Sequence, residues 1–447
     1  MEGGLKAPTR HPHRFNEPDY LDEEKLDAEL RRVFDICHGC RRCFNLCDSF
    51  PRLFELIDGS ESGELDTVSS DGFGLVMDGC TLCDMCFMVS CPYVPPHELN
   101  VDFPHLVLRY RAGQRAKGAV SWADRQLART DRNGKFATSI AWLTNWASKT
   151  TNWFTRPILE MFVGVDRNAS LPRYSSRTLI QRSGREVPEI NRTAPSFGRK
   201  VALFATCFAD YNNPHIGLAA RGVLAHNGID CTIVYPECCG MPQLEQGDFG
   251  AVAEKARTVS AALAAWINDD YDIVALVPSC ALMLKFEWAL ILPNDANVRK
   301  LSTHTFDISE YIVGLSQKEG LADGLSSLSG GVTVHLACHA RAQNIGPKAV
   351  EMLRLIPNVD LTVIERCSGH GGVWGLKKGH FDTALKVGKP AARYAIKAAS
   401  AFVTSECPLA GEHLRQGMER LANGPLMIEQ VTHPIQLLAH AYGLGEG

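Results

Sequence analysis

The chain has 447 residues, more than one ordinary hydrophobic core holds, so we expect two to four domains. With 45% apolar and 21% charged residues, the composition excludes a disordered or fibrous chain. The formal net charge of −4 lacks the basic excess that binding to phosphate backbones needs, so no nucleic-acid partner is expected.

Cysteine is unusually frequent: the chain has 16 cysteines, and half of them fall between positions 37 and 91. The first residues, MEGGLKAPTRHPHRF, lack the apolar stretch of a signal peptide, and no run reaches the roughly 18 apolar residues of a spanning helix. We therefore expect a cytoplasmic protein, with peripheral attachment to the cytoplasmic face of a membrane as the alternative. Cysteines in that reducing compartment are more often metal ligands or catalytic groups than disulfides.

The N-terminal part divides into a polar extension, residues 1–30, and a cysteine-rich domain, residues 31–130. A helix is predicted over residues 20–34, where apolar and charged residues alternate with helical spacing. The domain carries two dense cysteine groups, which read Cys37-x2-Cys40-x2-Cys43-x3-Cys47 and Cys80-x2-Cys83-x2-Cys86-x4-Cys91-Pro92.

Each group begins with three cysteines spaced by two residues, and such a ladder directs each thiolate to a different iron of one cubane. In two-cluster ferredoxins the distant fourth cysteine of each group completes the other cluster. The spacing therefore predicts two [4Fe–4S] clusters. One is assigned to Cys37, Cys40, Cys43 and Cys91, and the other to Cys80, Cys83, Cys86 and Cys47.

Two departures from the ferredoxin pattern leave every ligand in place. The second group has four residues before its last cysteine, and Asp48 follows the first group where proline is usual. Zinc is the alternative, but zinc sites normally use two Cys-x2-Cys pairs, which a repeated triple ladder fits badly. The 32 residues between Cys47 and Cys80 and the helical flank resemble the helical ferredoxin domain of fumarate reductase iron–sulfur subunits.

Residues 131–198 contain no cysteine and form a Trp-containing helical segment followed by a polar linker. We expect a helical stripe that includes Trp142 and Trp153 to pack on the domains that follow. The alternative is an amphipathic helix at a membrane interface, which Trp side chains and the nearby Lys149 and Arg156 favour.

Two weaker signals flank these segments. The basic stretch at residues 109–132 is interpreted as a solvated helix face, with docking to an acidic partner or to anionic lipid as the alternative. The glycine-rich residues 369–372 lack the spacing of a nucleotide-binding loop. We expect these glycines to let the backbone approach a cluster closely.

The C-terminal part contains an internal repeat. Each copy has three short apolar strands, at residues 201–207, 231–235 and 272–280 in the first copy and at 332–338, 361–364 and 401–407 in the second. Strands that alternate with helices predict parallel α/β units, whose ligands bind at the carboxyl edge of the sheet. We expect two such domains, residues 199–325 and 330–445, facing each other. The predicted fold class is a multidomain α+β chain, with a helical ferredoxin domain followed by two repeated α/β modules with parallel sheets.

Several passages of this repeat resemble a known family: CFADYNNPHIG, ECCGMPQ, CHARAQNIG, CSGHGGVWGLKKGHF and THPIQLLAHA. They are similar to the cysteine-rich (CCG) modules of heterodisulfide reductase and its relatives. Two ferredoxin-type clusters followed by two CCG modules resemble the plan of the iron–sulfur subunit of anaerobic glycerol-3-phosphate dehydrogenase. The iron–sulfur subunits of heterodisulfide reductase and glycolate oxidase share that plan. The likeness spans residues 31–445.

In heterodisulfide reductases a complete CCG module has five cysteines and holds an unusual [4Fe–4S] cluster that works on a disulfide. The first module here matches at four positions and has Met283 at the fifth. The matching cysteines are Cys207, Cys238, Cys239 and Cys280. The resemblance implies a third iron–sulfur centre at these four thiols.

The second module keeps three cysteines, Cys338, Cys367 and Cys407, and has Ser368 and Ala410 at the other two positions. Either a borrowed ligand completes a metal centre here, or the module is a degenerate scaffold with buried cysteines. The nearest candidate ligands are His339, His370 and Glu406. Cys231 lies in a strand outside the pattern and is predicted to be a core residue.

The resemblance implies an iron–sulfur electron-transfer subunit of an oxidoreductase complex. A redox partner, a flavoprotein or a di-iron enzyme, would exchange single electrons with the N-terminal clusters, and the CCG region would connect them to a quinone or a second protein. The chain has no glycine fingerprint for a flavin or a nicotinamide, so two-electron chemistry is assigned to another chain.

Two alternatives stay open. One is an enzyme that reduces a disulfide or another small substrate at the first CCG centre. The other is an adaptor whose CCG half binds no metal. Total iron separates the adaptor, with about eight irons per chain, from the other two, with about twelve.

Overall fold

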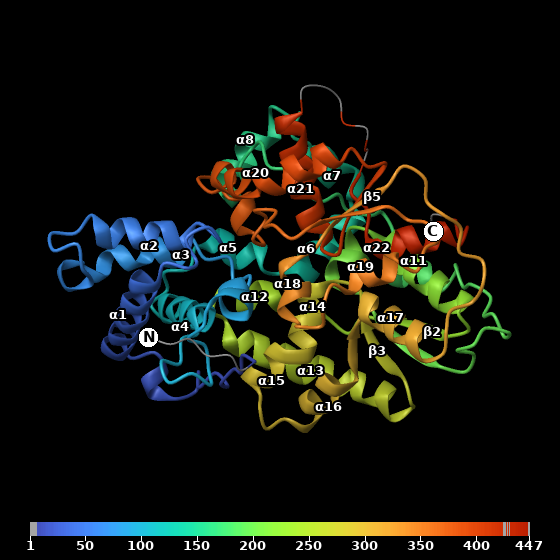
Figure 1. The fold of residues 1–447 in the computed structure, drawn as a ribbon, viewed down its shortest axis with the longest axis horizontal. Helices are drawn as coiled ribbons and strands as arrows, with labels where there is room; N and C mark the ends of the chain where they lie inside the picture. The colour runs from blue at the N-terminus through green and yellow to red at the C-terminus, as the bar shows by residue number, and fades with distance from the viewer. Residues whose placement is uncertain (1–6, 423–425, 427, 429, 446–447) are drawn as a thin grey trace.

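Figure 1 shows the fold in a computed structural model that describes residues 7–422, 426, 428 and 430–445. A helical N-terminal domain lies at one end of the molecule, and two α/β modules with parallel sheets make up most of the rest. This architecture confirms the predicted fold class. Residues 1–6 of the predicted N-terminal extension lie outside the described residues. Within the described part of the chain, no helix is both long and apolar enough to cross a bilayer.

The first long helix, α1 (Glu23–Cys40), carries the first two cysteines in its last turns. It begins after Asp22, whose side chain accepts a hydrogen bond from the Lys25 amide. It ends where Arg41 adopts a left-handed conformation, with φ 53°. The helix therefore starts and ends later than the predicted residues 20–34, because the Asp22 cap fixes its start and its apolar face continues past the predicted end.

Three further α-helices complete the N-terminal domain. They are α2 (Ser49–Asp58), α3 (Phe73–Asp78) and α4 (Phe103–Ala116), with the 3-10 turns η1 (Pro18–Tyr20), η2 (Leu65–Thr67) and η3 (Ser70–Gly72) and the π-helical turn η4 (Cys86–Ser90). Aromatic rings fill the core, where Phe34 contacts Phe73 and Phe103. The helices bring the two cysteine groups together, since one group runs from the last turns of α1 into the loop before α2 and the other lies between α3 and α4.

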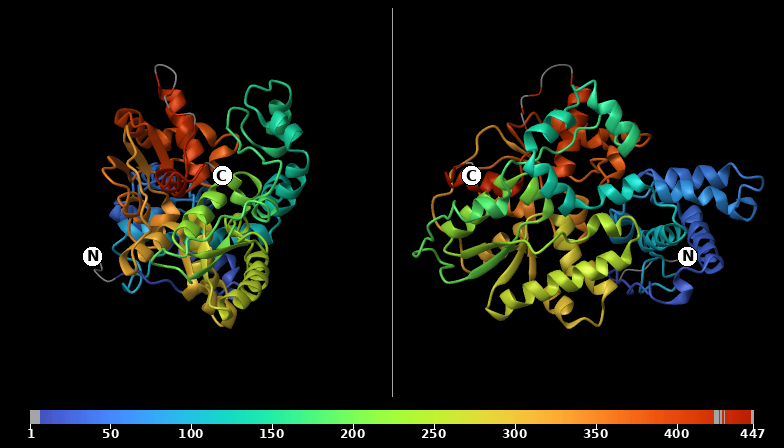
Figure 2. Two further views of the ribbon diagram at one scale, coloured as in Figure 1. Left: turned by 90° about the vertical axis from the view of Figure 1, so that its right-hand side faces the viewer. Right: turned by 180° about the vertical axis from the view of Figure 1, so that it is seen from behind.

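Five helices connect this domain to the first module: α5 (Trp122–Leu127), α6 (Thr130–Ser139), α7 (Ala141–Ser148), α8 (Thr155–Val163) and α9 (Leu179–Ser183). Helices α7 and α8 form a hairpin that projects beside the C-terminal module (Figure 2). Arg156 braces the hairpin from within: it is 1% exposed and donates hydrogen bonds to the backbone carbonyls of Ser148, Asp166, Arg167 and Ala169. Arg156 therefore does not supply the interfacial charge that the alternative, a membrane-interface helix, assigned to it.

The outer face of the α7–α8 hairpin is apolar and exposed. Trp142 is 77% exposed and Trp153 is 85% exposed. The other exposed apolar side chains are Leu143, Trp146, Phe154, Ile158, Met161 and Phe162. The prediction that the Trp stripe packs on the following domains is wrong, because the inward positions of α8 are taken by Arg156 and Glu160.

The first α/β module has a four-stranded parallel sheet in the order β2-β1-β3-β4. Its strands are β1 (Lys200–Phe204), β2 (Asp230–Val234), β3 (Asp272–Ala275) and β4 (Thr305–Asp307). Its helices are α10 (Cys207–Tyr211), α11 (Pro214–His226), α12 (Met241–Leu244), α13 (Phe249–Asn268), α14 (Pro278–Leu282), the π-helical turn η5 (Met283–Glu287), α15 (Trp288–Ile291), α16 (Ala296–His304) and α17 (Ile308–Lys318). The three predicted strands are present but end before their cysteines, and β4 was not predicted.

The second module repeats this order with three parallel strands, β6-β5-β7. The strands are β5 (Val332–His335), β6 (Leu361–Ile364) and β7 (Phe402–Ser405). The helices are α18 (Cys338–Ala342), α19 (Lys348–Leu353), the 3-10 turn η6 (Trp374–Leu376), α20 (Phe381–Ala398), α21 (Pro408–Leu421) and α22 (Pro434–Ala441). Where the first module has β4, the second has a parallel bridge between Thr404 and Thr432.

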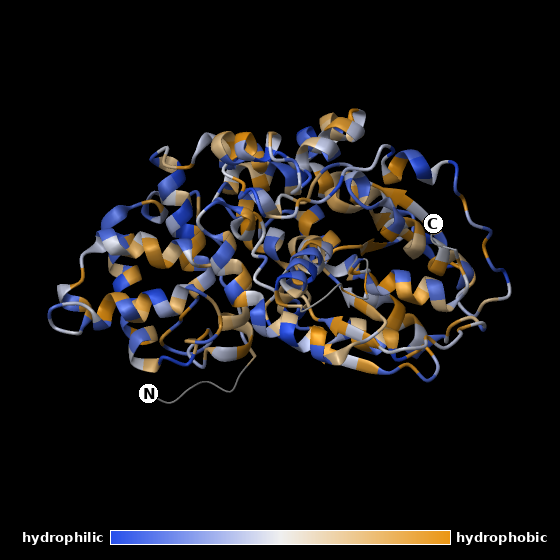
Figure 3. Cartoon of the chain, turned by 90° about the horizontal axis from the view of Figure 1, so that it is seen from above, coloured by the Kyte–Doolittle hydropathy of each residue, from blue (hydrophilic) through white to orange (hydrophobic). Residues whose placement is uncertain are grey.

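The two modules share one hydrophobic core and exchange their last helices. Helix α17 of the first module packs against α19 of the second, and α22 of the second packs against α11 of the first. The shared core includes Val201, Leu203, Val332, Val334 and Ile435. Hydrophobic residues run along the strands and the inner helix faces (Figure 3). This packing points the cysteine-bearing ends of both sheets at one cavity.

Candidate metal centres

The first N-terminal thiol set combines residues from both ends of the domain. The structure places Cys91 with Cys37, Cys40 and Cys43 around one small space, next to Tyr93. Cys37 and Cys40 lie three residues apart on α1, which puts them on one face of the helix. Burial and the neighbouring thiols, Cys91 first, raise the pKa of Cys37 well above its usual value.

The second set has the reciprocal composition. Cys47 lies with Cys80, Cys83 and Cys86 around a second small space. The chain reaches this arrangement through left-handed backbone conformations on either side of Cys83, at Leu82 and Asp84. The ring of Phe50 is 2% exposed and lines both spaces, so it lies between the two sets.

Four grouped thiols are a donor set that fits an iron–sulfur cluster. Burial raises the pKa of Cys83 to about 12 and, together with Cys80 and Cys83, raises the pKa of Cys47 well above its usual value. Grouped thiolates repel one another in a buried site, and bound metal reverses this because it stabilises the deprotonated form. The residues of both sets therefore suit a cationic metal centre better than free thiols.

The first CCG module brings its four matching cysteines together. The sulfurs of Cys207 and Cys238 are 3.9 Å apart, and those of Cys239 and Cys280 are 3.2 Å apart. All four cysteines follow strand ends: Cys207, Cys280 and the Cys238–Cys239 pair. Cys207 is the first residue of α10, and Cys280 lies within α14. Neighbouring thiols and burial raise the pKa of Cys207 and of Cys239 well above the usual value. This donor set also fits a metal centre.

Residues outside the cysteine pattern surround this first CCG set. The Asp131 carboxylate, from α6, accepts hydrogen bonds from the Cys238 amide at 2.9 Å and from the Tyr235 hydroxyl at 2.5 Å. The Trp288 indole donates to the Cys239 carbonyl at 3.1 Å. Sequence reasoning missed these neighbours because they come from distant segments. Met283, at the fifth position, is fully buried in the core.

The second CCG module keeps its three cysteines near one another, but in a more open setting. Cys338, Cys367 and Cys407 line one cavity together with Cys83. Burial and these neighbouring thiols raise the pKa of Cys338 well above its usual value. Cys367 is exposed. Ser368, at the position of a missing cysteine, is buried and lines the same cavity.

The three candidate borrowed ligands have different surroundings. His370 lines the cavity, and its buried Nδ1 has no hydrogen-bond partner. His339 also lines the cavity, but its Nδ1 contacts the Ser279 hydroxyl at 3.0 Å and its Nε2 donates to the Leu82 carbonyl at 3.1 Å. Glu406 is buried elsewhere and accepts from the Ala337 amide at 3.1 Å. Of the three, His370 alone has a ring nitrogen that the described contacts leave unpaired.

A cavity of about 660 Å³ connects these centres. All seven CCG cysteines line it, as do Cys47 and Cys83 of the second N-terminal set. Its wall also contains apolar side chains, Arg341, Arg366 and Glu245. Burial raises the pKa of the Glu245 carboxyl to about 7.

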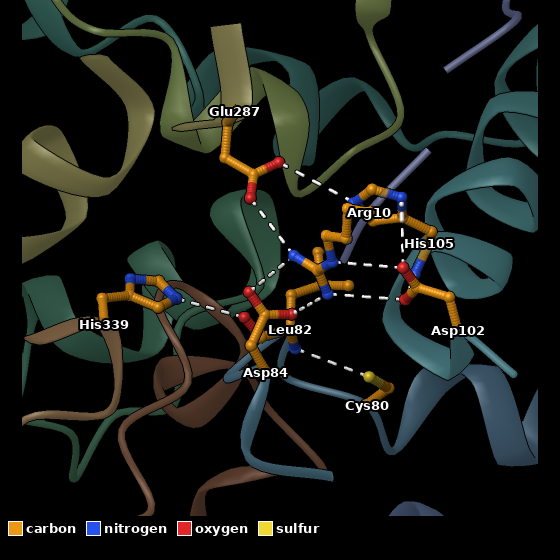
Figure 4. A network of polar contacts seen from close by, with 8 residues as sticks. All are labelled: Arg10, Cys80, Leu82, Asp84, Asp102, His105, Glu287 and His339. Carbon is orange, nitrogen blue, oxygen red and sulfur yellow. Dashed lines mark hydrogen bonds and ion pairs between the residues drawn. The ribbon is translucent and has the colours of Figure 1, made fainter. Parts of the chain in front are cut away.

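The second CCG module and helix α4 hold the loop that carries Cys80 and Cys83. Figure 4 shows His339 of the second module reaching the Leu82 carbonyl inside this loop. On the other side, Arg111 of α4 donates to the Cys80 carbonyl at 2.6 Å and to the Glu245 carbonyl of the first module at 2.8 Å. Arg109 likewise donates to the Asp19 and Tyr20 carbonyls. The predicted solvated face of the basic stretch is therefore wrong for these two arginines, which join segments of the fold.

Two minor predictions can be judged directly. Cys231 is 5% exposed in the shared core, which confirms that it is a core residue. In the glycine-rich stretch, a side chain at Gly371 would lie 2.5 Å from the Thr81 side chain, and one at Gly372 would contact the Glu245 carboxylate. These glycines permit a close approach to the cysteine-bearing loop around Thr81.

Comparison with known proteins identifies the modules and the relatives. A family model described as a cysteine-rich domain, CCG, matches residues 201–285 and 332–415. A subunit of the anaerobic glycerol-3-phosphate dehydrogenase of Escherichia coli is 25% identical over 318 residues, which cover 70% of this chain and 76% of that protein. Lactate utilization protein A of Bacillus cytotoxicus is 30% identical over 190 residues, which cover 40% and 75%. A subunit of the fumarate reductase (CoM/CoB) of Methanothermobacter marburgensis is 25% identical over 282 residues, which cover 60% and 52%. The resemblance read from the sequence is confirmed.

Proposed function

Since this chain belongs to a family of iron–sulfur proteins with CCG domains, we propose that it passes single electrons between a flavoprotein partner and a quinone. The family includes lactate utilization protein A and the iron–sulfur subunit of anaerobic glycerol-3-phosphate dehydrogenase. The membership itself makes it an iron–sulfur electron-transfer subunit rather than a stand-alone disulfide reductase. Partner and acceptor are the proposed parts.

The observation that carries the proposal is the shared cavity. Thiols from the N-terminal domain and from both CCG modules line one space of about 660 Å³, a size typical of small-molecule sites. Iron–sulfur clusters held at the two N-terminal sets and at the first CCG set would accept and donate one electron at a time. The chain contributes the ligands, the burial and the fixed charges around them.

The cavity wall suits a quinone head group. Apolar residues such as Leu127 and Pro390 offer contact to a ring, and Arg341 and Arg366 offer hydrogen-bond donors. Reduction of a quinone to a quinol takes two electrons and two protons. The Glu245 carboxyl, whose pKa lies near 7, can hold one of those protons inside the cavity at neutral pH.

The α7–α8 hairpin supports a membrane-bound acceptor. Its exposed Trp, Phe and Met side chains match a surface that enters the headgroup region of a bilayer. The segments that lead into and out of the hairpin, at Gly134 and Tyr174, line the cavity. We therefore place the hairpin in the interface, with the cavity near the membrane surface and the flavoprotein at the N-terminal domain.

The test uses anaerobically prepared, cluster-loaded protein. Reduced with dithionite and freed of excess reductant, it should be reoxidised by a soluble quinone analogue. In the oxidised form it should stay unchanged when glycerol 3-phosphate, a 2-hydroxy acid or a dithiol is added without a flavoprotein. Direct reduction by one of these compounds alone would contradict the relay and, for the dithiol, would favour a disulfide reductase.

A further inference from the structure

Three side chains from distant parts of the chain lie close together where the N-terminal segment, residues 7–17, packs on the fold. His13 lies in that segment, His105 in α4 and Glu287 in η5 of the first module. One ligand atom from each lies within 4.8 Å of the others. His13 is 8% exposed and Glu287 is 4% exposed. The group lies outside the cysteine sites and was not visible in the sequence, because its members are separated by more than 90 and 180 residues.

The facing atoms of these three side chains have no hydrogen-bond partner. They are Nε2 of His13, Nε2 of His105 and Oε2 of Glu287, and all three are buried. The His105 and Glu287 atoms are 4.0 Å apart, too far for a hydrogen bond. Buried polar atoms without partners are rare, and three that converge on one point call for a ligand.

The other ring nitrogen of each histidine faces an oxygen. Nδ1 of His105 lies 3.4 Å from the Asp102 carboxylate, and Nδ1 of His13 lies 3.2 Å from the Tyr20 hydroxyl. Figure 4 shows the His105 ring between Asp102 and Glu287. A proton on each Nδ1 leaves both Nε2 lone pairs free, and the Nε2 of His105 lies 4.0 Å from the Glu287 carboxylate. Outer carboxylates orient metal-binding histidines in this way.

The surrounding charges favour a dication. Arg10 pairs with Asp84, Asp102 and Glu287 at 2.7, 3.1 and 3.3 Å. One cation and three carboxylates leave a formal charge of −2 in a site where each of these side chains is at most 15% exposed. An uncompensated buried charge is costly. A divalent ion at the three free atoms makes the whole group neutral.

We propose that His13, His105 and Glu287 bind a zinc(II) ion. Two imidazoles and one carboxylate are a set of ligands that zinc accepts, with water in the fourth position. Ligands 2.0–2.1 Å from a tetrahedral zinc ion are about 3.4 Å apart. The three ligand atoms, which lie within 4.8 Å of one another, must therefore move closer by at most about 1.4 Å when zinc binds. The ion joins three parts of the fold: the N-terminal segment, the helical domain and the first CCG module.

Backbone contacts already dock the N-terminal segment along the same path. The His13 amide donates to the Leu290 carbonyl at 2.8 Å, and the Thr9 amide donates to the Pro95 carbonyl at 3.0 Å. The zinc ion closes this strap over the junction between the two domains. It therefore fixes how the N-terminal thiol sets sit against the CCG modules, and it needs no redox chemistry of its own.

The experiment uses the full chain, prepared anaerobically with its clusters loaded, incubated with zinc chloride and then desalted. Metal analysis should give about one zinc per chain, and zinc K-edge absorption should show nitrogen and oxygen neighbours with imidazole scattering. Sulfur neighbours at about 2.3 Å would place the zinc at cysteines and overturn the proposal. So would a protein that retains no zinc. These measurements on the unmodified chain decide the matter even if a variant fails to fold.

Variants then locate the ion. His105→Gln and Glu287→Gln should each lower zinc affinity by at least about tenfold while the cluster absorbance stays unchanged. His11→Ala is the matched control: His11 lies on the same segment, but it is exposed and contacts Asn100. It should retain full zinc. Limited proteolysis should cut the N-terminal segment faster in His105→Gln than in His11→Ala. Equal zinc affinity in His105→Gln, Glu287→Gln and His11→Ala would overturn the assignment.

Discussion

The two CCG modules have the same fold and different sites. Both have a central parallel strand flanked by the next two strands in the same order. In the first module four cysteines form two close sulfur pairs, at 3.9 and 3.2 Å. Asp131 and Trp288 form hydrogen bonds with the backbone of Cys238 and Cys239. In the second module three cysteines remain, Ser368 replaces a fourth, and Cys367 is exposed.

This difference shows that the fold and the ligand set are independent. The apolar residues that hold the sheets lie on strands and helices, whereas the cysteines of the CCG pattern lie after the strand ends. The second module instead supports the α7–α8 hairpin. The Lys378 amide donates to the Gly164 carbonyl, and the Ser170 hydroxyl donates to Glu412. We infer that the first module serves the metal and the second serves docking.

The largest effect is expected from substituting a cysteine in each of the two CCG modules. Cys239→Ser should remove one paramagnetic signal and about four irons per chain, because it deletes one of four grouped thiols. Cys367→Ser should leave that signal, since its module keeps only three thiols. Electron paramagnetic resonance and iron analysis of anaerobic samples measure both.

Cys231→Ala is the matched control, because Cys231 is a buried cysteine of the first module that lies in the shared core away from the thiol set. It should keep every signal. If Cys367→Ser removed the signal and Cys239→Ser did not, the metal would belong to the second module.

The sequence predicted those features whose signals are local. Cysteine spacing located the N-terminal groups, and short apolar runs ending near cysteines located β1 and β5. The sequence did not predict the features that depend on packing between distant parts of the chain. Nothing near Arg156 shows that four carbonyls will surround its guanidinium, and no pattern links His13 to Glu287. β4 was missed because it has three residues and a single apolar one, Phe306, which give no strand signal.

The second prediction tests whether the α7–α8 hairpin, which the second module supports, is a membrane-docking surface. Trp142→Glu combined with Trp153→Glu should lower binding to phosphatidylglycerol-containing vesicles by at least about tenfold, because charge replaces exposed rings at the membrane interface. Vesicle co-sedimentation measures the change. Leu75→Glu is the control, since Leu75 is 64% exposed on α3 of the helical domain, outside the hairpin. Equal losses in both would show that the hairpin is not the docking surface.

The third prediction concerns how the second module holds the cysteine-bearing loop. His339→Ala removes both ring contacts and leaves the Leu82 carbonyl and the Ser279 hydroxyl without this partner. We expect a loss of about 1–3 kcal/mol in stability, measured as a lower midpoint of thermal unfolding. Iron content should be unchanged. Loss of iron together with normal unfolding would instead make His339 a metal ligand.

The smallest effect tests Arg111 of α4, which joins the same loop to the first module. Burial raises the pKa of the Cys80 thiol, and the nearby positive charge of Arg111 opposes that shift. Reduction of a cluster adds negative charge, so a nearby cation favours the reduced form. Arg111→Gln removes the charge, and we expect the potential of the centre at Cys47, Cys80, Cys83 and Cys86 to fall by about 40 mV, which corresponds to about 1 kcal/mol for one electron.

Arg111→Lys keeps the charge but loses the paired contacts to the Cys80 and Glu245 carbonyls. It should destabilise the junction without moving the potential. A redox titration followed by paramagnetic resonance separates the two variants. Equal shifts in both, or a shift in the centre at Cys37 as well, would mean that Arg111 acts by positioning the loop and not by its charge.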